Sequence, residues 1–126
     1  MISVLIVDDS VTIRAMLEEV LGRETDFRLV GSAADARSAL DMIREHHPDV
    51  TTIDIAMPGP DGLSLLDKVH LHTHAIMLTG RADAFEDSID RGALGFFNKS
   101  HILSDSKKLV KMVRDAAEGK LTKKAA

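Results

Sequence analysis

Short apolar runs alternate along the whole chain with stretches in which apolar residues recur every three or four positions. The apolar runs predict strands, and those at the start of the chain and before residue 80 are apolar at nearly every position, as in strands buried on both faces. The predicted strands span Ile2 to Val7, Phe27 to Ala33, Val50 to Ile55, Ala75 to Thr79 and Leu94 to Phe97.

The stretches between the runs predict amphipathic helices. Their apolar faces include Leu17, Ala39, Leu66, Ile89 and Val113, one in each predicted helix, and Ser10 is the expected N-cap of the first. Strands that alternate with helices form parallel βαβ units, whose right-handed crossovers place helices on both faces of one sheet. We therefore predict an α/β fold with a doubly wound, five-stranded parallel sheet and five helices.

The length and composition indicate one domain. A chain of 126 residues with 44% hydrophobic and 29% charged residues can bury a single core. We expect this domain to span residues 1–120 and residues 121–126 to form a short flexible tail.

The charge balance and the lack of special segments narrow the classes of function. Sixteen basic and twenty acidic residues give a formal net charge of −4, which argues against nucleic-acid binding. The chain has no cysteine, so a disulfide scaffold, a thiol nucleophile and a cysteine zinc site are excluded. The apolar run at the N-terminus is too short for a signal peptide or a membrane span. We expect a cytoplasmic protein without membrane insertion, and a monomer.

Polar residues follow the predicted strands at their carboxyl ends. Asp8 and Asp9 follow the first strand, Asp54 lies at the end of the third, Thr79 ends the fourth, and Lys99 comes just after the fifth. Ligands of open parallel sheets bind beyond the carboxyl ends of the strands, so these side chains are expected to converge. Each of these residues, taken alone, has a common structural explanation: acids often lie at a helix N-terminus, and lysines are frequent on protein surfaces. Their common position makes the combination specific.

Three carboxylates at one rim predict a site for a divalent cation. Without a cation they would repel one another, and the pKa of one would rise. Mg²⁺ prefers one or two carboxylates together with water and a phosphate oxygen. Asp9 and Asp54 are the expected direct ligands, Asp8 binds directly or through water, and the backbone carbonyl of Ala56 is a further candidate ligand.

The same rim has the groups that phosphoryl transfer needs. Lys99 can pair with one phosphate oxygen, and the Thr79 hydroxyl can donate to another. Gly80 leaves space for a phosphate to approach the backbone. Asp54, at the end of the central strand, is then the best candidate for a carboxylate nucleophile that forms an aspartyl phosphate.

These residues resemble the receiver domain of two-component response regulators, and the resemblance covers essentially the whole chain. It is carried by the segments Val7-Asp8-Asp9-Ser10, Ile53-Asp54-Ile55-Ala56-Met57-Pro58-Gly59-Pro60-Asp61-Gly62, Leu78-Thr79-Gly80 and Gly92-Ala93-Leu94-Gly95-Phe96-Phe97-Asn98-Lys99. The resemblance implies the strand order 2-1-3-4-5 of flavodoxin-like and CheY-like folds, which is a known property of those folds. It also implies that the acid pair binds Mg²⁺ and that Asp54 is phosphorylated.

The resemblance further implies a switch and its partners. In the family, phosphorylation draws the threonine toward the phosphate and turns an aromatic side chain on the last strand inward; the corresponding residues here are Thr79 and Phe96. The partners implied are a histidine kinase or histidine phosphotransfer protein, and a target that binds the face of the fourth helix, fifth strand and fifth helix. The chain is expected to act as a CheY-like single-domain regulator, with chemotaxis as one setting.

Two departures from the family pattern bear on the site. The family commonly has a proline, after a cis peptide, where Ser100 follows Lys99, and a cis bond before another residue costs about 3 kcal/mol. Whether this bond is cis or trans decides the path of the next loop. Pro60 replaces a usual apolar residue after Asp54 and is expected to stiffen that loop.

Other functions are compatible with parts of the pattern. A phosphate sink or phosphorelay intermediate would use the same site. A metal-dependent phosphatase that forms an aspartyl phosphate would resemble Asp-x-Asp after the first strand, where this chain has Asp8 and Ser10. A flavin-binding protein of flavodoxin shape would have a phosphate loop rich in serine and threonine there. An interaction module independent of phosphorylation would not need the intact set of acids.

Overall fold

The computed structural model describes residues 1–122, and within them it contains every predicted strand and helix. The strands are β1 (Ile2–Val7), β2 (Phe27–Ala33), β3 (Val50–Asp54), β4 (His74–Thr79) and β5 (Gly95–Asn98). The helices are α1 (Val11–Gly22), α2 (Ala36–His46), α3 (Gly62–Val69), α4 (Phe85–Asp90) and α5 (Ser106–Ala117), with 3₁₀ turns at η1 (Ala82–Ala84) and η2 (Lys99–His101). No helix of this part of the chain is long and apolar enough to cross a membrane.

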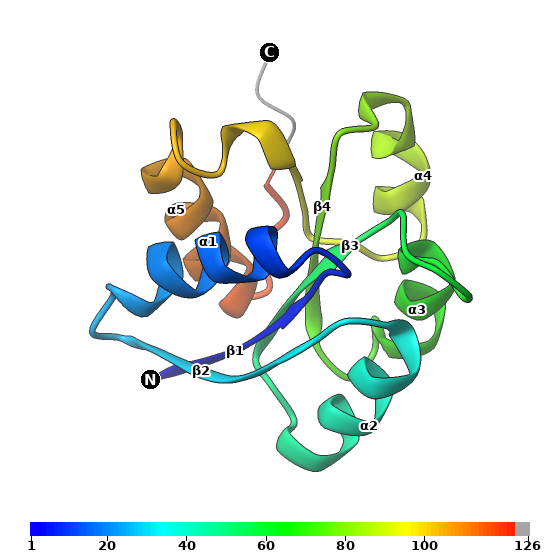
Figure 1. Ribbon diagram of the computed structural model, residues 1–126, viewed down its shortest axis with the longest axis horizontal. Helices are drawn as coiled ribbons and strands as arrows, with labels where there is room; N and C mark the ends of the chain where they lie inside the picture. Colours follow the sequence, from blue (N-terminus) through cyan, green and yellow to red (C-terminus); the bar gives the residue numbers. More distant parts are fainter. Residues whose placement is uncertain (123–126) are drawn as a thin grey trace.

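The strands form one parallel sheet in the order β2-β1-β3-β4-β5 (Figure 1). This confirms the predicted α/β class and the strand order that the resemblance implies. The order reverses between β1 and β3, so the chain leaves these two neighbouring strands toward opposite faces of the sheet. Their carboxyl ends therefore flank a crevice, which is where Asp8, Asp9 and Asp54 are found.

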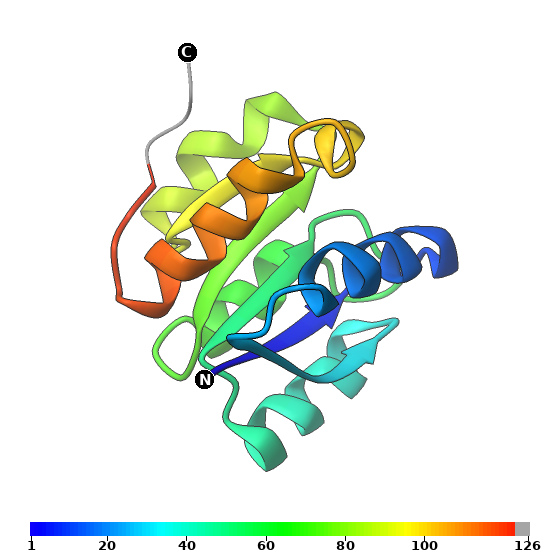
Figure 2. The ribbon, with the colours of Figure 1, turned by 90° about the vertical axis from the view of Figure 1, so that its left-hand side faces the viewer.

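The sheet separates the core into two layers of side chains. Val4 and Ile6 of β1 pack with α1 and α5 on one face, which Figure 2 turns toward the viewer. Leu5 and Val7 point the other way and pack with α2, α3, η1 and α4. Successive residues from Ser3 to Val7 thus point to different faces and are all buried, because both faces of this central strand are covered by helices.

Side-chain caps start the first three of the five helices, each of which follows a strand at the site end of the sheet. Ser10 accepts a hydrogen bond from the Ile13 N–H at the start of α1, as predicted. Asp35 caps α2 and Asp61 caps α3 in the same way. Each cap satisfies one N–H group that the first helical turn leaves without a partner, and so fixes where the helix begins.

The ends of the elements differ from the sequence-based prediction by one residue at a few places. β3 ends at Asp54 instead of Ile55, β4 begins at His74, and β5 is shifted by one position. In the predicted tail, Thr122 donates its backbone N–H to the Leu94 carbonyl at 2.8 Å. The rest of that tail, residues 123–126, lies outside the described residues.

Candidate functional site

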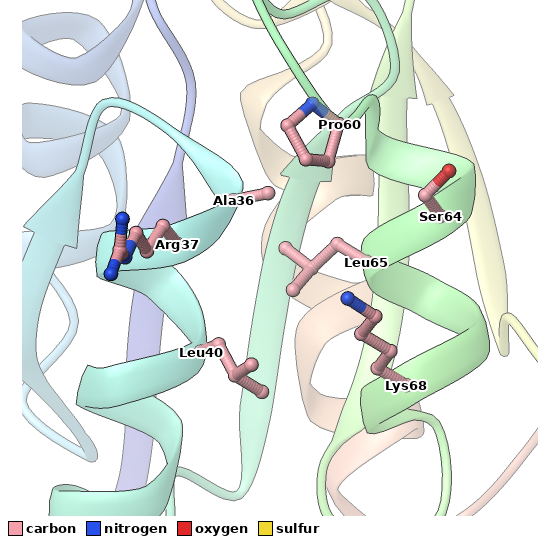
Figure 3. A pocket seen from close by; sticks show the side chains of 7 residues that line it. All are labelled: Ala36, Arg37, Leu40, Pro60, Ser64, Leu65 and Lys68. Atoms are coloured by element: carbon pink, nitrogen blue, oxygen red, sulfur yellow. The ribbon is translucent and has the colours of Figure 1, made fainter.

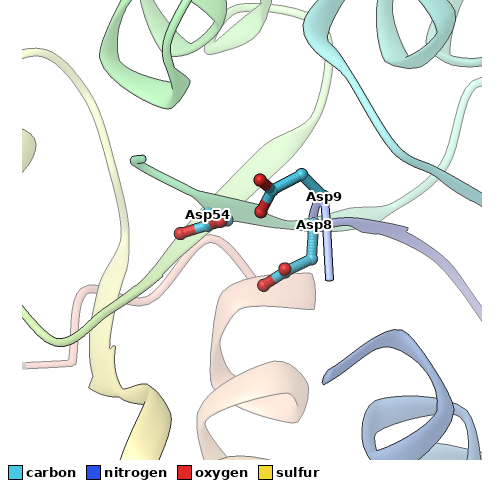
Figure 4. Close-up of side chains that lie close together, drawn as sticks. All are labelled: Asp8, Asp9 and Asp54. Carbon is cyan, nitrogen blue, oxygen red and sulfur yellow. The ribbon is translucent and has the colours of Figure 1, made fainter. Parts of the chain in front are cut away.

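Three carboxylates come together at the carboxyl ends of β1 and β3. Oxygen atoms of Asp8, Asp9 and Asp54 all lie within 4.8 Å of one another, and Figure 4 shows the three side chains grouped at this rim. Asp8 and Asp54 are buried, whereas Asp9 is exposed. The structure thus brings together the acids that the sequence predicted to meet.

Asp8 is held by its local backbone, which leaves one oxygen for the site. Its Oδ1 accepts the Ser10 N–H at 2.9 Å, and its backbone carbonyl accepts a hydrogen bond from Arg14 at 2.8 Å. Since Oδ1 is occupied, Oδ2 is the oxygen directed to the cluster. Arg14 was not predicted from the sequence, because only the fold brings the first turn of α1 against this carbonyl.

Lys99 extends from the end of β5 between the two buried acids. Its Nζ lies 3.1 Å from Asp8 Oδ2 and 3.3 Å from Asp54 Oδ2. These contacts are ion pairs, but within residues 1–122 neither oxygen accepts a well-directed hydrogen bond. One ammonium group therefore partly compensates two buried carboxylates.

Burial and charge act on the pKa of Asp54 in opposite directions. Desolvation, and secondly the charge of Asp8, raise the pKa of Asp54 from 3.8 to about 6, although Lys99 lowers it. For Lys99, desolvation works against the charged form, but Asp8 and Asp54 outweigh it and raise the pKa. The cluster thus holds more negative charge at neutral pH than its surroundings stabilise.

The donor set fits a hard divalent cation. The Oδ2 atoms of Asp8 and Asp54 are buried acceptors without a well-directed donor, and Asp9 adds a third carboxylate from the solvent side. Mg²⁺ binds through one or two carboxylates together with water, and the exposed Asp9 lies on the side from which water can approach. Ala56, whose carbonyl was a further candidate ligand, lies exposed in the loop after β3. The acid cluster could therefore bind Mg²⁺.

The two predicted switch residues lie farther along the sheet edge. Thr79 is buried at the end of β4, and its hydroxyl accepts the Arg81 N–H at 3.1 Å. Phe96 of β5 is half-buried and packs edge-on against Phe85 of α4, with ring centres 5.6 Å apart. In this state the Thr79 hydroxyl is engaged with its own loop and not with the carboxylates.

The loop after Lys99 follows a trans path. No cis peptide bond occurs in the described residues, so the Lys99–Ser100 bond is trans. Asn98 then caps the η2 turn, because its Oδ1 accepts both the backbone N–H of Ser100 at 2.9 Å and its hydroxyl at 2.8 Å. The serine in place of proline thus supplies two donors, and Lys99 still reaches both acids.

Gly62 contributes to the site by the absence of a side chain. A Cβ placed there would lie 2.1 Å from the Asp54 carbonyl oxygen and 2.8 Å from the Ile55 Cα. The Gly62 N–H also donates to the Ile55 carbonyl at 2.8 Å. The first turn of α3 therefore packs directly against the backbone that carries Asp54. The sequence contained Gly62 within a motif, but this contact is visible only in the folded chain.

Comparison with known families identifies this arrangement. The sequence model of one family, the response regulator receiver domain, matches residues 4–114 of this chain. The chain therefore belongs to the response regulator receiver domain family.

Curated relatives are larger proteins. A protein-glutamate methylesterase/protein-glutamine glutaminase of Shewanella sp. (strain MR-4) is 37% identical over 99% of this chain and 39% of its own length. Its counterpart from Pseudomonas aeruginosa is 52% identical over 54% of this chain and 20% of its own length. This chain thus spans less than half the length of these two relatives.

Solved structures agree on the fold. The response regulator domain of Thermotoga maritima CheB superposes with a TM-score of 0.86 at 29% identity, covering 94% of this chain and 97% of that one. CheY in the CheX–CheY–BeF3–Mg²⁺ complex of Borrelia burgdorferi superposes with a TM-score of 0.80 at 30% identity, covering 90% of this chain and 87% of that one. The fold is thus that of CheY-like receiver domains.

Proposed function

We propose that this receiver domain is a phosphoacceptor in which Asp54 takes a phosphoryl group with the help of Mg²⁺ and acts as a response regulator in a two-component phosphorelay. The observation that carries the proposal is the convergence of Asp8, Asp9, Asp54 and Lys99 at one rim. A structural role alone would not require two buried carboxylates that share one ammonium group. The relative from Borrelia burgdorferi, solved with BeF3 and Mg²⁺, supports the same kind of site.

The transfer step follows from the positions of these groups. A carboxylate oxygen of Asp54 attacks the phosphorus of the donor, and the bond from phosphorus to the donor breaks with its electron pair leaving on the donor. Asp8 and Asp9 would hold Mg²⁺, which supplies charge neutralisation to the phosphoryl oxygens when bound. Lys99 compensates the negative charge of the product, because its ammonium group already lies 3.3 Å from Asp54.

The donor and the output follow from the family. The donor is a histidine kinase or a histidine phosphotransfer protein, and the domain promotes its own phosphorylation and dephosphorylation without acting on a separate substrate. The output is a change in the face formed by α4, β5 and α5, which binds a protein target. Chemotaxis is the setting that the curated relatives favour, and a phosphate sink or relay intermediate would use the same chemistry.

The switch would exchange the partners of two side chains. In the unphosphorylated domain Thr79 accepts the Arg81 N–H, and Phe96 packs against Phe85. A phosphoryl group on Asp54 offers the Thr79 hydroxyl an acceptor, and movement of Thr79 frees space into which Phe96 can turn. One added charged group thereby biases a two-state packing arrangement at α4 and β5.

The proposal is tested with a small-molecule donor. The protein is mixed with acetyl phosphate and Mg²⁺ and its intact mass is recorded. We expect a labile gain of one phosphoryl group that is absent after EDTA treatment and absent in Asp54→Asn. The matched control is Asp41→Asn, which removes an exposed acid of α2 and is expected to be phosphorylated normally. No gain in the folded protein with Mg²⁺, or equal gain in Asp54→Asn, would refute the assignment.

A further inference from the structure

The surface between α2 and α3 forms a groove that the proposed phosphoryl chemistry does not use. One hollow of about 240 Å³ lies between the first turns of the two helices, and a second of about 460 Å³ continues toward their carboxyl ends. Leu40 and Lys68 line both hollows, so the two are parts of one groove. We call this surface the α2–α3 groove.

The floor of the groove is apolar. Leu65 lines the first hollow and Ile43 and Val69 line the second, and all three are buried. Leu40 is half-buried and reaches toward α3 (Figure 3). A partner could therefore pack apolar side chains on the open part of Leu40, above this buried apolar floor.

Every charged side chain that lines the groove is basic. Arg37, Arg44 and Lys68 are exposed, and no acidic residue lines either hollow. Figure 3 shows the Lys68 amino group reaching across the groove toward α2, whereas Arg37 lies along the outer side of α2. This cationic surface belongs to a chain with a net charge of −4, so it is a local feature.

Ion pairs do not neutralise these three cations in the part of the chain that the structure describes. Within residues 1–122, none of the three forms an ion pair with a carboxylate. Arg37 contributes only as a minor cause to the lowered pKa of Asp35, after the backbone and side-chain hydrogen bonds from Ser38.

A simpler explanation accounts for only part of this pattern. Basic residues in the last turn of a helix stabilise its dipole, and Arg44 and Lys68 occupy such positions. Arg37 is the second residue of α2, where the dipole favours an acid instead. The dipole therefore does not explain why basic side chains follow the whole length of the groove.

We propose that the α2–α3 groove binds an acidic amphipathic helix of a partner protein. The lining of α2 runs from Ala36 to His47, which corresponds to about 16 Å or about three turns of a helix laid alongside. Apolar side chains of the partner at positions i and i+4 pack on Leu40 and enter the hollows beside it, and its acidic side chains pair with Lys68 and Arg44. This surface is separate from the α4-β5-α5 face and does not rest on phosphorylation of Asp54.

The test uses a designed peptide and the unphosphorylated protein. The probe is a fluorescein-labelled 15-residue peptide with leucines on one helical face and glutamates beside them; a shuffled version and one with lysine in place of glutamate are controls. We expect rising anisotropy only with the first peptide, weakened by salt. Amide resonances should shift in α2 and α3.

Charge reversal tests the basic residues. Arg44→Glu/Lys68→Glu is expected to weaken binding about tenfold. The matched control, Lys107→Glu/Lys108→Glu, reverses two exposed charges on α5 and should leave binding unchanged. A thermal melt checks that each variant is folded, and the salt dependence of the unmodified protein tests the charge pairing independently.

Several outcomes would overturn the proposal. Equal weakening by both double variants would show a response to net charge alone. Resonance shifts on another face, or no binding of the acidic peptide, would assign the groove no partner of this class. Self-association that Arg44→Glu/Lys68→Glu abolishes, detected by sedimentation without peptide, would make a second copy of this chain the occupant instead.

Discussion

Replacing Asp54 with asparagine should stabilise the metal-free protein at neutral pH. The carboxylate is buried, lies near Asp8 and shares one ammonium group with it. Asparagine has nearly the same shape and carries no charge, so it resembles the protonated carboxyl group. The substitution therefore removes the cost of keeping a second negative charge in the buried cluster.

The magnitude follows from the pKa of Asp54. This pKa is raised from 3.8 to about 6, chiefly by desolvation and then by Asp8. Because each pH unit between the two values corresponds to about 1.4 kcal/mol, the charged form costs up to about 3 kcal/mol. Relaxation and water entry reduce this cost, so we expect Asp54→Asn to raise the free energy of unfolding by about 1–3 kcal/mol.

The sign of the pH dependence is the reverse of that for a salt-bridged carboxylate. A raised folded-state pKa means that the folded protein keeps its proton while the unfolded chain releases it. The stability of the unmodified protein therefore falls, relative to Asp54→Asn, as the pH rises from about 4 to about 6. Above this pH range the difference in the free energy of unfolding between the two proteins is constant, and below it the difference vanishes.

Urea unfolding in EDTA between pH 4 and pH 8 measures this difference in the free energy of unfolding, and the titration of groups far from Asp54 cancels between the two proteins. Asp41→Asn, an exposed acid on α2, is the control and should show no such pH-dependent gap. Added Mg²⁺ should stabilise the unmodified protein and so reduce the difference in the free energy of unfolding between it and Asp54→Asn. An Asp54→Asn protein that is less stable at pH 7.5, or a gap independent of pH, would refute the reasoning.

Two further substitutions examine the surroundings of Asp54. Gly62→Ala should lower the free energy of unfolding by about 1–3 kcal/mol, because its Cβ would lie 2.1 Å from the Asp54 carbonyl oxygen. Gly80→Ala, whose Cβ would meet nothing within 4 Å, is the control in urea unfolding, and equal losses would contradict this explanation. Lys99→Met should destabilise the metal-free protein by about 1–3 kcal/mol, since two buried carboxylates lose their cation. Because Nζ no longer competes for these oxygens, Mg²⁺ should bind more tightly in calorimetry; weaker binding would contradict that competition.

The sequence predicted the fold and the acid cluster because both depend on short-range patterns. Continuous apolar runs identify strands buried on two faces, and a polar residue just after such a run lies at the rim of a parallel sheet. This logic placed Asp8, Asp9 and Asp54 together, as the structure confirms. Strand ends were off by one residue where the backbone hydrogen bonds, and not hydrophobicity, decide the boundary, as at Asp54.

Other features of the site depend on contacts that no local pattern contains. The Arg14 side chain reaches the Asp8 carbonyl only because α1 packs back over β1. The steric need for glycine at position 62 arises from the approach of α3 to the end of β3. Likewise, the basic lining of the α2–α3 groove depends on the rotation of two helices about their axes, so Arg37 and Lys68 could not be placed on one surface beforehand.

The division of the core by the sheet has a consequence for how such a domain can change over time. Val4 and Leu5 are neighbours in sequence, yet they pack in different layers, and the two buried clusters share no residue. Substitutions in one layer should therefore combine additively with those in the other, without mutual compensation. The sequences of the two layers can therefore diverge independently. This is consistent with a backbone that superposes on a relative with a TM-score of 0.86 at only 29% sequence identity.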